Sequence, residues 1–432
     1  MGGIIGSGIF INPYVVARQV HTPFLILGVW AAGGLIALAG AFIYAELAAR
    51  RPEVGGQYAY LREAYHPLVA FIYGWALLLV TQTGGMAAVA LTFARYFVEL
   101  LHVQWADWII ATSALTVLTV INCLGVKAGS MVQSALMVTK LIAIFALIAC
   151  GLFLTERGSN QVAARTIDSF DGAFSFDLLT AVGAAMVPVL FAYGGWQTSS
   201  FIAGEVREPR LNLPRGLIIG VTGVVILYLG VNYVCLRMLG TVGLAATQTP
   251  ATDVMRATLG ERGARLIAAG IAVSTFGFLS QGMLTAPRVY FAMAEDKLFF
   301  KSVGWLHPRT RVPVVAIALQ GVLAIAIALS GRYEQILNYV VSVDFIFFGL
   351  TATCIFVFRR RRHQERASME NEVGNGQQSI PGHPLTTALF IIACWLVVLN
   401  TIYKYPTNSV IGLLIMLAGI PAYFFWKRRG KR

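Results

Sequence analysis

Long apolar runs separated by short polar segments dominate the pattern of this chain. A helix needs about 20 apolar residues to cross the hydrocarbon core of a membrane, whereas barrel strands alternate over segments of about ten. The unbroken runs therefore favour helices and predict an all-α membrane protein with twelve spans. These spans lie near residues 3–20, 23–48, 67–98, 106–125, 130–154, 179–203, 214–238, 264–292, 313–330, 335–358, 385–403 and 409–426.

The composition excludes an ordinary soluble enzyme. Of the 432 residues, 57% are apolar and only 12% are charged, whereas soluble domains carry about 25% charged residues. A formal net charge of +13 would suggest nucleic-acid binding in a soluble protein. Here the basic residues form short clusters between apolar runs, as cytoplasmic loops do. We therefore expect a lipid bilayer around the chain and no nucleic-acid partner.

The positions of Lys and Arg predict the orientation in the membrane. If the N-terminus is cytoplasmic, most of the 33 Lys and Arg residues fall in inward-facing segments, among them Arg50, Arg51, the run Arg359–Arg362 and the tail at 427–432. The positive-inside rule then places both termini in the cytoplasm, as in a multi-pass protein of the cytoplasmic (inner) membrane. We also expect the first helix to begin upstream of Met1, because little chain precedes Gly6; the alternative is a short re-entrant segment.

The first span carries residues that favour a break in the helix. Gly3, Gly6 and Gly8 surround Ser7, and Pro13 follows; glycine and proline both disfavour a helix interior. Non-helical backbone at membrane depth persists only where it lines a cavity. The free N–H groups that open the next half-helix favour a carboxylate. The alternative is a small-residue face that packs against another helix.

The sixth span carries a second break. Pro188 precedes the segment Phe191–Gln197, which contains Gly194 and Gly195. Two broken helices that open two five-helix halves match the inverted-repeat transporters, in which the breaks meet at the bilayer midplane and form the substrate site. The alternative is that these glycines only permit close packing.

This pattern predicts the division of the chain. Residues 1–358 form an inverted-repeat transport core, with helices one to five over about 1–154 and helices six to ten over about 179–358. Residues 359–384 form a cytoplasmic loop, 385–426 form helices eleven and twelve, and 427–432 form a basic cytoplasmic tail.

Two ionisable residues lie inside predicted spans, where such residues are usually functional. Lys140 is near the middle of the fifth span, too deep for its stem to reach water. It could brace the unwound first helix by donating to carbonyls, carry a proton, or be a structural cation with a fixed partner. Asp344, in the tenth span, could contact a neighbouring helix, lie at the outer vestibule, or couple transport to an ion.

The remaining chemistry-bearing residues point to no enzyme. The five cysteines lie in or beside apolar runs without metal-ligand spacing, and the six histidines lie at loops or span ends. We predict no catalytic residue, no metal and no cofactor. An embedded enzyme or a channel is the alternative class, but neither an intramembrane catalytic cluster nor a repeated polar pore lining is visible.

Several motifs together resemble the L-type amino acid transporters of the amino acid, polyamine and organocation (APC) superfamily. The resemblance runs in order from residue 1 to about residue 360. The motifs are Gly2-Gly3-Ile4-Ile5-Gly6-Ser7-Gly8-Ile9-Phe10, Tyr44-Ala45-Glu46-Leu47, Gly55-Gly56-Gln57-Tyr58-Ala59-Tyr60, Asn122-Cys123-Leu124-Gly125-Val126-Lys127 and Phe191-Ala192-Tyr193-Gly194-Gly195-Trp196.

The resemblance implies a twelve-helix fold with five-plus-five inverted repeats, helices one and six unwound, and alternating access. It implies that the substrate carboxylate binds around Ser7 and Gly8, that the ammonium binds the carbonyls of Ile4, Phe191 and Gly194, and that Phe191 gates the site. Lys140 matches a lysine near the sodium position of sodium-coupled relatives, which argues against sodium coupling. The full predicted substrate-binding set is Ile4, Gly6, Ser7, Gly8, Phe191, Ala192, Gly194 and Gln197.

The sequence also departs from the family pattern. Animal members join a heavy chain through a cysteine between helices three and four, but Glu99–Asp107 contains none. We therefore expect a prokaryotic single-chain form without a disulfide-linked partner. Gln197 and the region of Leu350 differ from forms that accept large aromatic substrates, so the side-chain preference stays open. The prediction is sodium-independent exchange of neutral L-amino acids; the alternative is a proton-coupled amino acid or polyamine permease.

Overall fold

The computed structural model describes residues 2–51, 55–125, 130–154, 175–330, 332–368 and 380–429. Within these ranges the regular secondary structure is entirely helical, which confirms the all-α prediction. Nine of the described helical segments are long and apolar enough to cross a membrane. Two shorter apolar helices, Asp107–Cys123 and Val314–Ser330, coincide with the predicted fourth and ninth spans.

The helices of the first half are α1 (Gly8–Gln19), α2 (Pro23–Arg50), α3 (Gln57–Ala64), α4 (Pro67–Ala76), the π-helix η1 (Leu77–Thr81), α5 (Gln82–Leu101), α6 (Asp107–Cys123) and α7 (Ser130–Phe153). The rest of the chain forms α9 (Phe176–Tyr193), the 3₁₀-helix η4 (Trp196–Glu205), α10 (Pro209–Ala246), α11 (Pro250–Thr285), α12 (Pro287–Glu295), η5 (Lys301–Gly304), α13 (Val314–Ser330), α14 (Tyr333–Ser368), α15 (Leu385–Lys404), α16 (Pro406–Leu417) and α17 (Gly419–Arg429).

Proline and short polar side chains set many helix starts. Pro23, Pro67 and Pro209 each stand in the first turn of a helix, where the missing N–H group is not needed. The Thr22 hydroxyl accepts a hydrogen bond from the Leu25 N–H at 3.3 Å, and Ser175 caps α9 in the same way through Leu178 at 3.2 Å. These local signals explain why the observed starts lie close to the predicted ones.

Four features of the helices differ from the predicted spans. Gly240 in α10 and Gly260 in α11 adopt positive φ values of 65° and 66°, so each helix is kinked there; α10 ends beyond its predicted span, at Ala246, and α11 begins before its predicted span, at Pro250. Pro287 opens α12 directly after α11 ends at Thr285, which divides the predicted eighth span. The helix α14 continues to Ser368, past the predicted boundary at 358, because nothing in the run of arginines there stops a helix.

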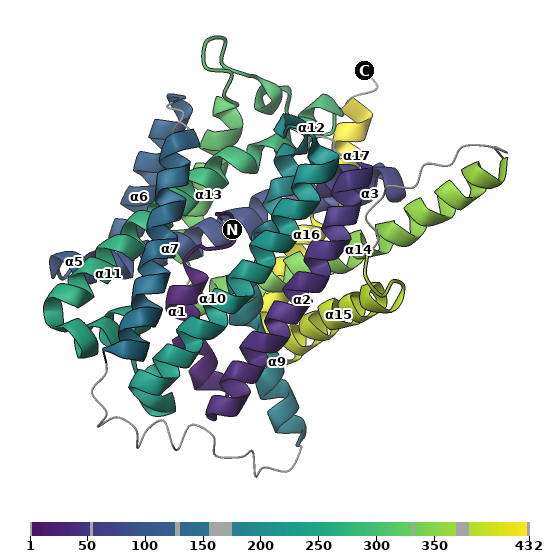
Figure 1. The fold of residues 1–432 in the computed structure, drawn as a ribbon. Helices are drawn as coiled ribbons and strands as arrows, with labels where there is room; N and C mark the ends of the chain where they lie inside the picture. Colours follow the sequence, from purple (N-terminus) through teal and green to yellow (C-terminus); the bar gives the residue numbers. More distant parts are fainter. Residues whose placement is uncertain are drawn as a thin grey trace.

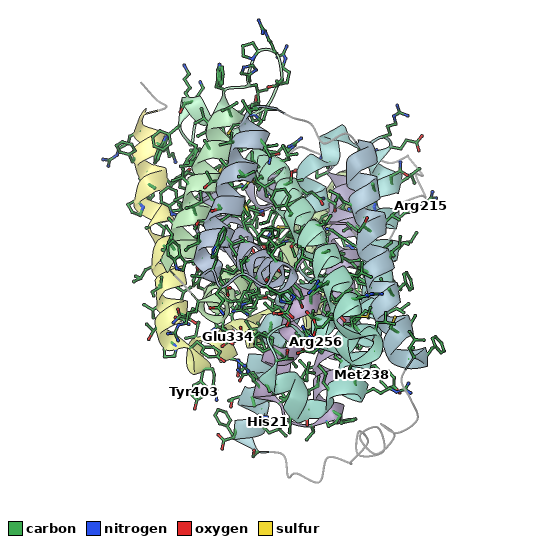
Figure 2. The ribbon with its side chains drawn as sticks, turned by 90° about the vertical axis from the view of Figure 1, so that its left-hand side faces the viewer. His21, Arg215, Met238, Arg256, Glu334 and Tyr403 are labelled. Atoms are coloured by element: carbon green, nitrogen blue, oxygen red, sulfur yellow. The ribbon has the colours of Figure 1, made fainter. Side chains whose placement is uncertain are left out.

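The helices pack side by side in one bundle (Figure 1). The first described residues lie inside the bundle, whereas α3, α12 and α17 lie together at one end, near the C-terminus (Figure 1). In Figure 2, Arg215 lies at this same end, and His21, Arg256 and Glu334 lie at the opposite end. We call these the Arg215 end and the Arg256 end.

Ionic networks tie helices together at both ends. Near the Arg215 end, the Glu46 side chain is 2% exposed and its carboxylate accepts hydrogen bonds from Arg50 at 2.6 Å, from Arg359 at 2.6 Å and from the Ile380 N–H at 3.2 Å. At the other end, Arg256 contacts carboxylates of α5 and α11, those of Glu99, Asp253 and Glu261. The apolar middle of the bundle lies between these two networks.

Parts of three predictions fall outside the described residues. These parts are Val126 and Lys127 of the fourth motif, positions 369–379 of the loop, and positions 430–432 of the tail.

Candidate substrate site

Residues 2–7, where the sequence predicts a break in the first span, are non-helical, and we call this segment the first break. The chain is non-helical before α1, which begins at Gly8, and Ser7 is its N-cap without a capping hydrogen bond from its side chain. The Ser7 side chain is 1% exposed, and its hydroxyl has no partner among the described residues. In the first turn of α1 the Phe10 N–H bonds to the Ser7 carbonyl at 3.0 Å, whereas the first N–H groups of a helix have no partner within it, and the Ser7 hydroxyl beside them is unpaired.

Two side chains from other helices hold the carbonyls of this break. The Lys140 ammonium, from α7, donates to the Ile5 carbonyl at 3.0 Å, and the Tyr228 hydroxyl, from α10, donates to the Ile4 carbonyl at 3.2 Å. Lys140 is only 3% exposed, and its ammonium lies 5.5 Å from the centroid of the Phe278 ring. Lys140 therefore has a fixed partner in the first break, a contact that fits both a brace and a structural cation.

The second break follows α9. Gly194 is extended, and Gly195 has a φ of 94°, in the left-handed region that favours glycine. The Gly195 N–H donates to the Gln197 side-chain oxygen at 2.9 Å, and the Thr198 hydroxyl donates to the Gly195 carbonyl at 2.7 Å. These two side chains satisfy the backbone that the break leaves unpaired.

The two breaks pack directly against each other. A Cβ atom added at Gly195 would lie 2.0 Å from the Gly3 carbonyl oxygen, and one added at Gly8 would lie 2.5 Å from the Ala192 Cα. Neither position has room for a side chain. The motifs that the sequence places about 190 residues apart therefore form one structural unit.

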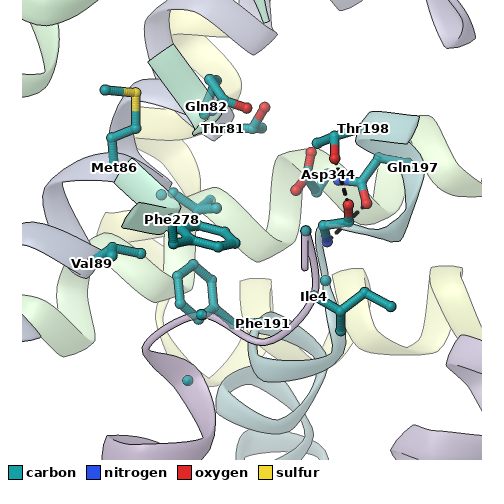
Figure 3. Close-up of a pocket in the computed structure, with 18 of the residues that line it drawn as sticks. Ile4, Thr81, Gln82, Met86, Val89, Phe191, Gln197, Thr198, Phe278 and Asp344 are labelled. Atoms are coloured by element: carbon teal, nitrogen blue, oxygen red, sulfur yellow. Dashed lines mark hydrogen bonds between the residues drawn. The ribbon is translucent and has the colours of Figure 1, made fainter. Parts of the chain in front are cut away.

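A cavity of about 100 Å³ lies where the breaks meet. All eight residues of the predicted substrate-binding set line it: Ile4, Gly6, Ser7, Gly8, Phe191, Ala192, Gly194 and Gln197. Lys140 does not line the cavity. It contacts the first break from outside the cavity, through the Ile5 carbonyl. Figure 3 shows Phe191 with its ring next to that of Phe278 at the cavity wall.

Other helices complete the cavity with residues that the sequence reading did not assign to the site. They include Thr81 and Gln82 at the π-helix, Met86 and Val89 of α5, Phe278 and Gln281 of α11, and Asp344 of α14. The π-helix inserts one extra residue per turn, and π-bulges are frequent at functional sites. No local pattern marks these positions, except that Asp344 is an ionisable residue within a span.

A second cavity adjoins the first. It shares Gly3, Ile4 and Gly195 with the first cavity and adds Asn212 and Leu213 from the start of α10. Arg215 is on the same helical turn and marks that end of the bundle (Figure 2). The site therefore continues toward the Arg215 end.

Toward the Arg256 end, hydrogen bonds close the bundle. The Asn12 amide donates to the Pro188 carbonyl at 2.5 Å and accepts from the Tyr333 hydroxyl at 2.7 Å. The Tyr96 hydroxyl donates to the Phe10 carbonyl at 2.7 Å. These contacts join α1 to α5, α9 and α14 on this side of the site.

An apolar helical bundle with two non-helical segments around a central cavity is typical of membrane transporters. The profile of the family described as amino acid permease matches residues 1–425, so the chain belongs to the amino acid permease family of the APC superfamily. It is an amino acid transporter and not an enzyme. This finding confirms the family resemblance of the motifs.

Curated relatives cover nearly the whole chain. A serine/threonine exchanger of Bacillus subtilis (strain 168) is 31% identical over 99% of this chain and 94% of its own length. The human b(0,+)-type amino acid transporter 1 is 28% identical over 99% of this chain and 85% of its own length. The human cystine/glutamate transporter is 27% identical, with 99% and 83% coverage.

Proposed function

We propose that this protein exchanges neutral L-amino acids across the cytoplasmic membrane by alternating access and without sodium. In this proposal the chain has twelve spans in five-plus-five inverted repeats, and its Arg215 end faces the cytoplasm. The protein works as a single chain without a disulfide-linked partner. The described helices, the two breaks and the positions of the basic residues support this arrangement.

One observation carries the proposal: an unpaired Ser7 hydroxyl at the start of α1, on the wall of a cavity formed by both breaks. The N–H groups of that first turn and the positive end of the helix dipole suit the substrate carboxylate. The carbonyls at the ends of the breaks suit the ammonium. Those of Phe191 and Gly194 are candidates, and Ile4 has one lone pair left beside its bond from Tyr228.

The contact of Lys140 supports sodium independence. A sodium ion that stabilised the unwound first helix would need main-chain carbonyls as ligands. The Lys140 ammonium is already a fixed positive charge at the Ile5 carbonyl. The Bacillus subtilis relative is named an exchanger, and the substrates in its name, serine and threonine, are neutral. Both points support exchange of neutral amino acids.

Counterflow in proteoliposomes tests this function. Vesicles loaded with unlabelled serine should accumulate labelled serine, and replacing sodium with choline should leave the initial rate unchanged. Steep sodium dependence would overturn the assignment of Lys140, and uptake driven only by a proton gradient would favour the proton-coupled alternative. Substrate turnover without transport would contradict the transporter function.

Ser7→Ala tests the carboxylate site. A hydrogen bond to a charged group contributes about 1.5–3 kcal/mol, so the substrate Kd should rise at least about tenfold. Ser113→Ala is the matched control, because Ser113 is exposed on α6 and bonds only to its own helix at Ile109. An unchanged Kd for Ser7→Ala would show that the carboxylate binds elsewhere.

Lys140→Met tests the brace. It keeps the length of the apolar stem but removes the ammonium that bonds to the Ile5 carbonyl, and transport should fall at least about tenfold. Lys404→Met, at the exposed end of α15, is the control. Equal rates for both variants at every pH would reduce Lys140 to a packing residue.

A further inference from the structure

Asp344 is an acidic side chain on the wall of the substrate cavity. It lies within the membrane-spanning part of α14 but stays partly exposed, and the surface it exposes lines the cavity. Figure 3 shows it together with Thr81 and Gln82, which come from the π-helix and α5. The cavity therefore has an acidic wall besides the two breaks.

No cation neutralises Asp344 inside the described part of the protein. None of the salt bridges there includes it, and Lys140, which bonds to the Ile5 carbonyl, does not line the cavity. The groups that face it are neutral: the Thr81 hydroxyl of η1, which donates to its carboxylate, and the rings of Tyr44 in α2 and Tyr73 in α4. One hydroxyl donor leaves most of the lone pairs of the carboxylate unpaired, which is costly at this depth, so a further donor from a ligand would stabilise it.

Other polar side chains of the cavity are already occupied. Gln197 and Thr198 bond to the backbone of Gly195, and the Thr285 hydroxyl donates to the Gln281 carbonyl at 3.1 Å. Asp344, by contrast, keeps free acceptor positions beside its bond from Thr81. It also lies on α14, whereas the backbone groups that suit an α-carboxylate and an α-ammonium lie on the two breaks.

We propose that Asp344 accepts a hydrogen bond from the substrate side chain, so that the protein selects amino acids with a hydroxyl or ammonium group there over apolar isosteres. The inference rests on the proposed amino acid transport at this site and deepens it. A carboxylate is a strong, charge-assisted acceptor. An apolar side chain leaves that acceptor unpaired, and buried polar groups built to bind a hydroxyl strongly reject analogues that lack it.

Threonine and valine test the inference, because they have the same shape and differ by a hydroxyl. In counterflow competition, the wild-type protein should bind threonine at least about a hundredfold more tightly than valine. In Asp344→Ala the ratio should fall to about ten or less, through weaker threonine binding and equal or tighter valine binding. Asp177→Ala, in the exposed first turn of α9, should leave the ratio unchanged.

A second variant keeps the test decisive if Asp344→Ala does not fold. Asp344→Asn keeps an acceptor oxygen but not the charge, so the ratio should fall about tenfold and remain above that of Asp344→Ala. Serine against 2,3-diaminopropionate separates the two donors: tighter binding of the diamino acid by the wild type assigns an ammonium, and tighter binding of serine assigns a hydroxyl.

Other results would overturn the inference. If Asp344→Ala weakens the binding of threonine and of valine equally, the carboxylate binds the α-ammonium and not the side chain. If the variant leaves both affinities and their ratio unchanged, Asp344 does not contact the substrate side chain. In both cases amino acid transport itself survives. Absence of counterflow in the wild type for every amino acid would instead refute the proposed function.

Discussion

The variant Gly195→Ala tests the close contact of Gly195 with Gly3, where the two breaks meet. The added Cβ would lie 2.0 Å from the Gly3 carbonyl oxygen, whereas a carbon and an oxygen in ordinary contact stay about 3.3 Å apart. The breaks would therefore have to separate by about 1.3 Å. A φ of 94° adds backbone strain of about 1–2 kcal/mol for an L-residue.

The expected result is a loss of transport with the helical fold retained. A displacement of about 1 Å in a binding site can cost about a hundredfold in rate, so the counterflow rate should fall by at least that factor. Initial rates in proteoliposomes at equal protein content measure the effect, and thermal unfolding in detergent checks the fold. Gly28→Ala is the control, because a Cβ there meets nothing within 4 Å.

The reasoning fails if Gly195→Ala transports at half the wild-type rate or more. It also fails if Gly28→Ala loses transport to the same extent, since the loss would then not depend on the contact with Gly3.

Two further predictions concern the ends of the bundle. Glu46→Gln should lower the free energy of unfolding by about 3 kcal/mol, because Arg50 and Arg359 lose their shared carboxylate. Thermal unfolding measures this loss, with Glu63→Gln, at a more exposed ion pair, as the control. A loss no larger than that of the control would contradict the prediction. Tyr333→Phe should cost about 1–3 kcal/mol, because the buried Asn12 side-chain oxygen loses its donor; an unchanged unfolding curve would contradict it.

Much of the candidate site can be predicted from the sequence alone, because glycine and proline act on the backbone locally. Gly3, Gly6 and Gly8 around Ser7, and Gly194 with Gly195, weaken a helix wherever they occur, and a weakened helix inside a membrane implies a cavity. The eight residues named from these motifs all line one cavity. The family profile confirms the class of protein that the motifs indicate.

What the sequence did not predict depends on packing between distant helices. Phe278 and Gln281 look like any residues of an apolar helix, and only the placement of α11 brings them to the cavity. The same holds for Tyr228, whose hydroxyl reaches Ile4 across 224 positions. Asp344 stood out as an ionisable residue, but its spacing gave no sign that it faces the same cavity as Ser7.

The fit between Gly3 and Gly195 has a mechanical consequence. Two chain segments that touch without room for a single methyl group cannot slide past one another. A movement of either segment toward the other must displace both, because no space separates them. The contact between Gly3 and Gly195 therefore couples the two non-helical segments mechanically, directly at the wall of the cavity that both residues line.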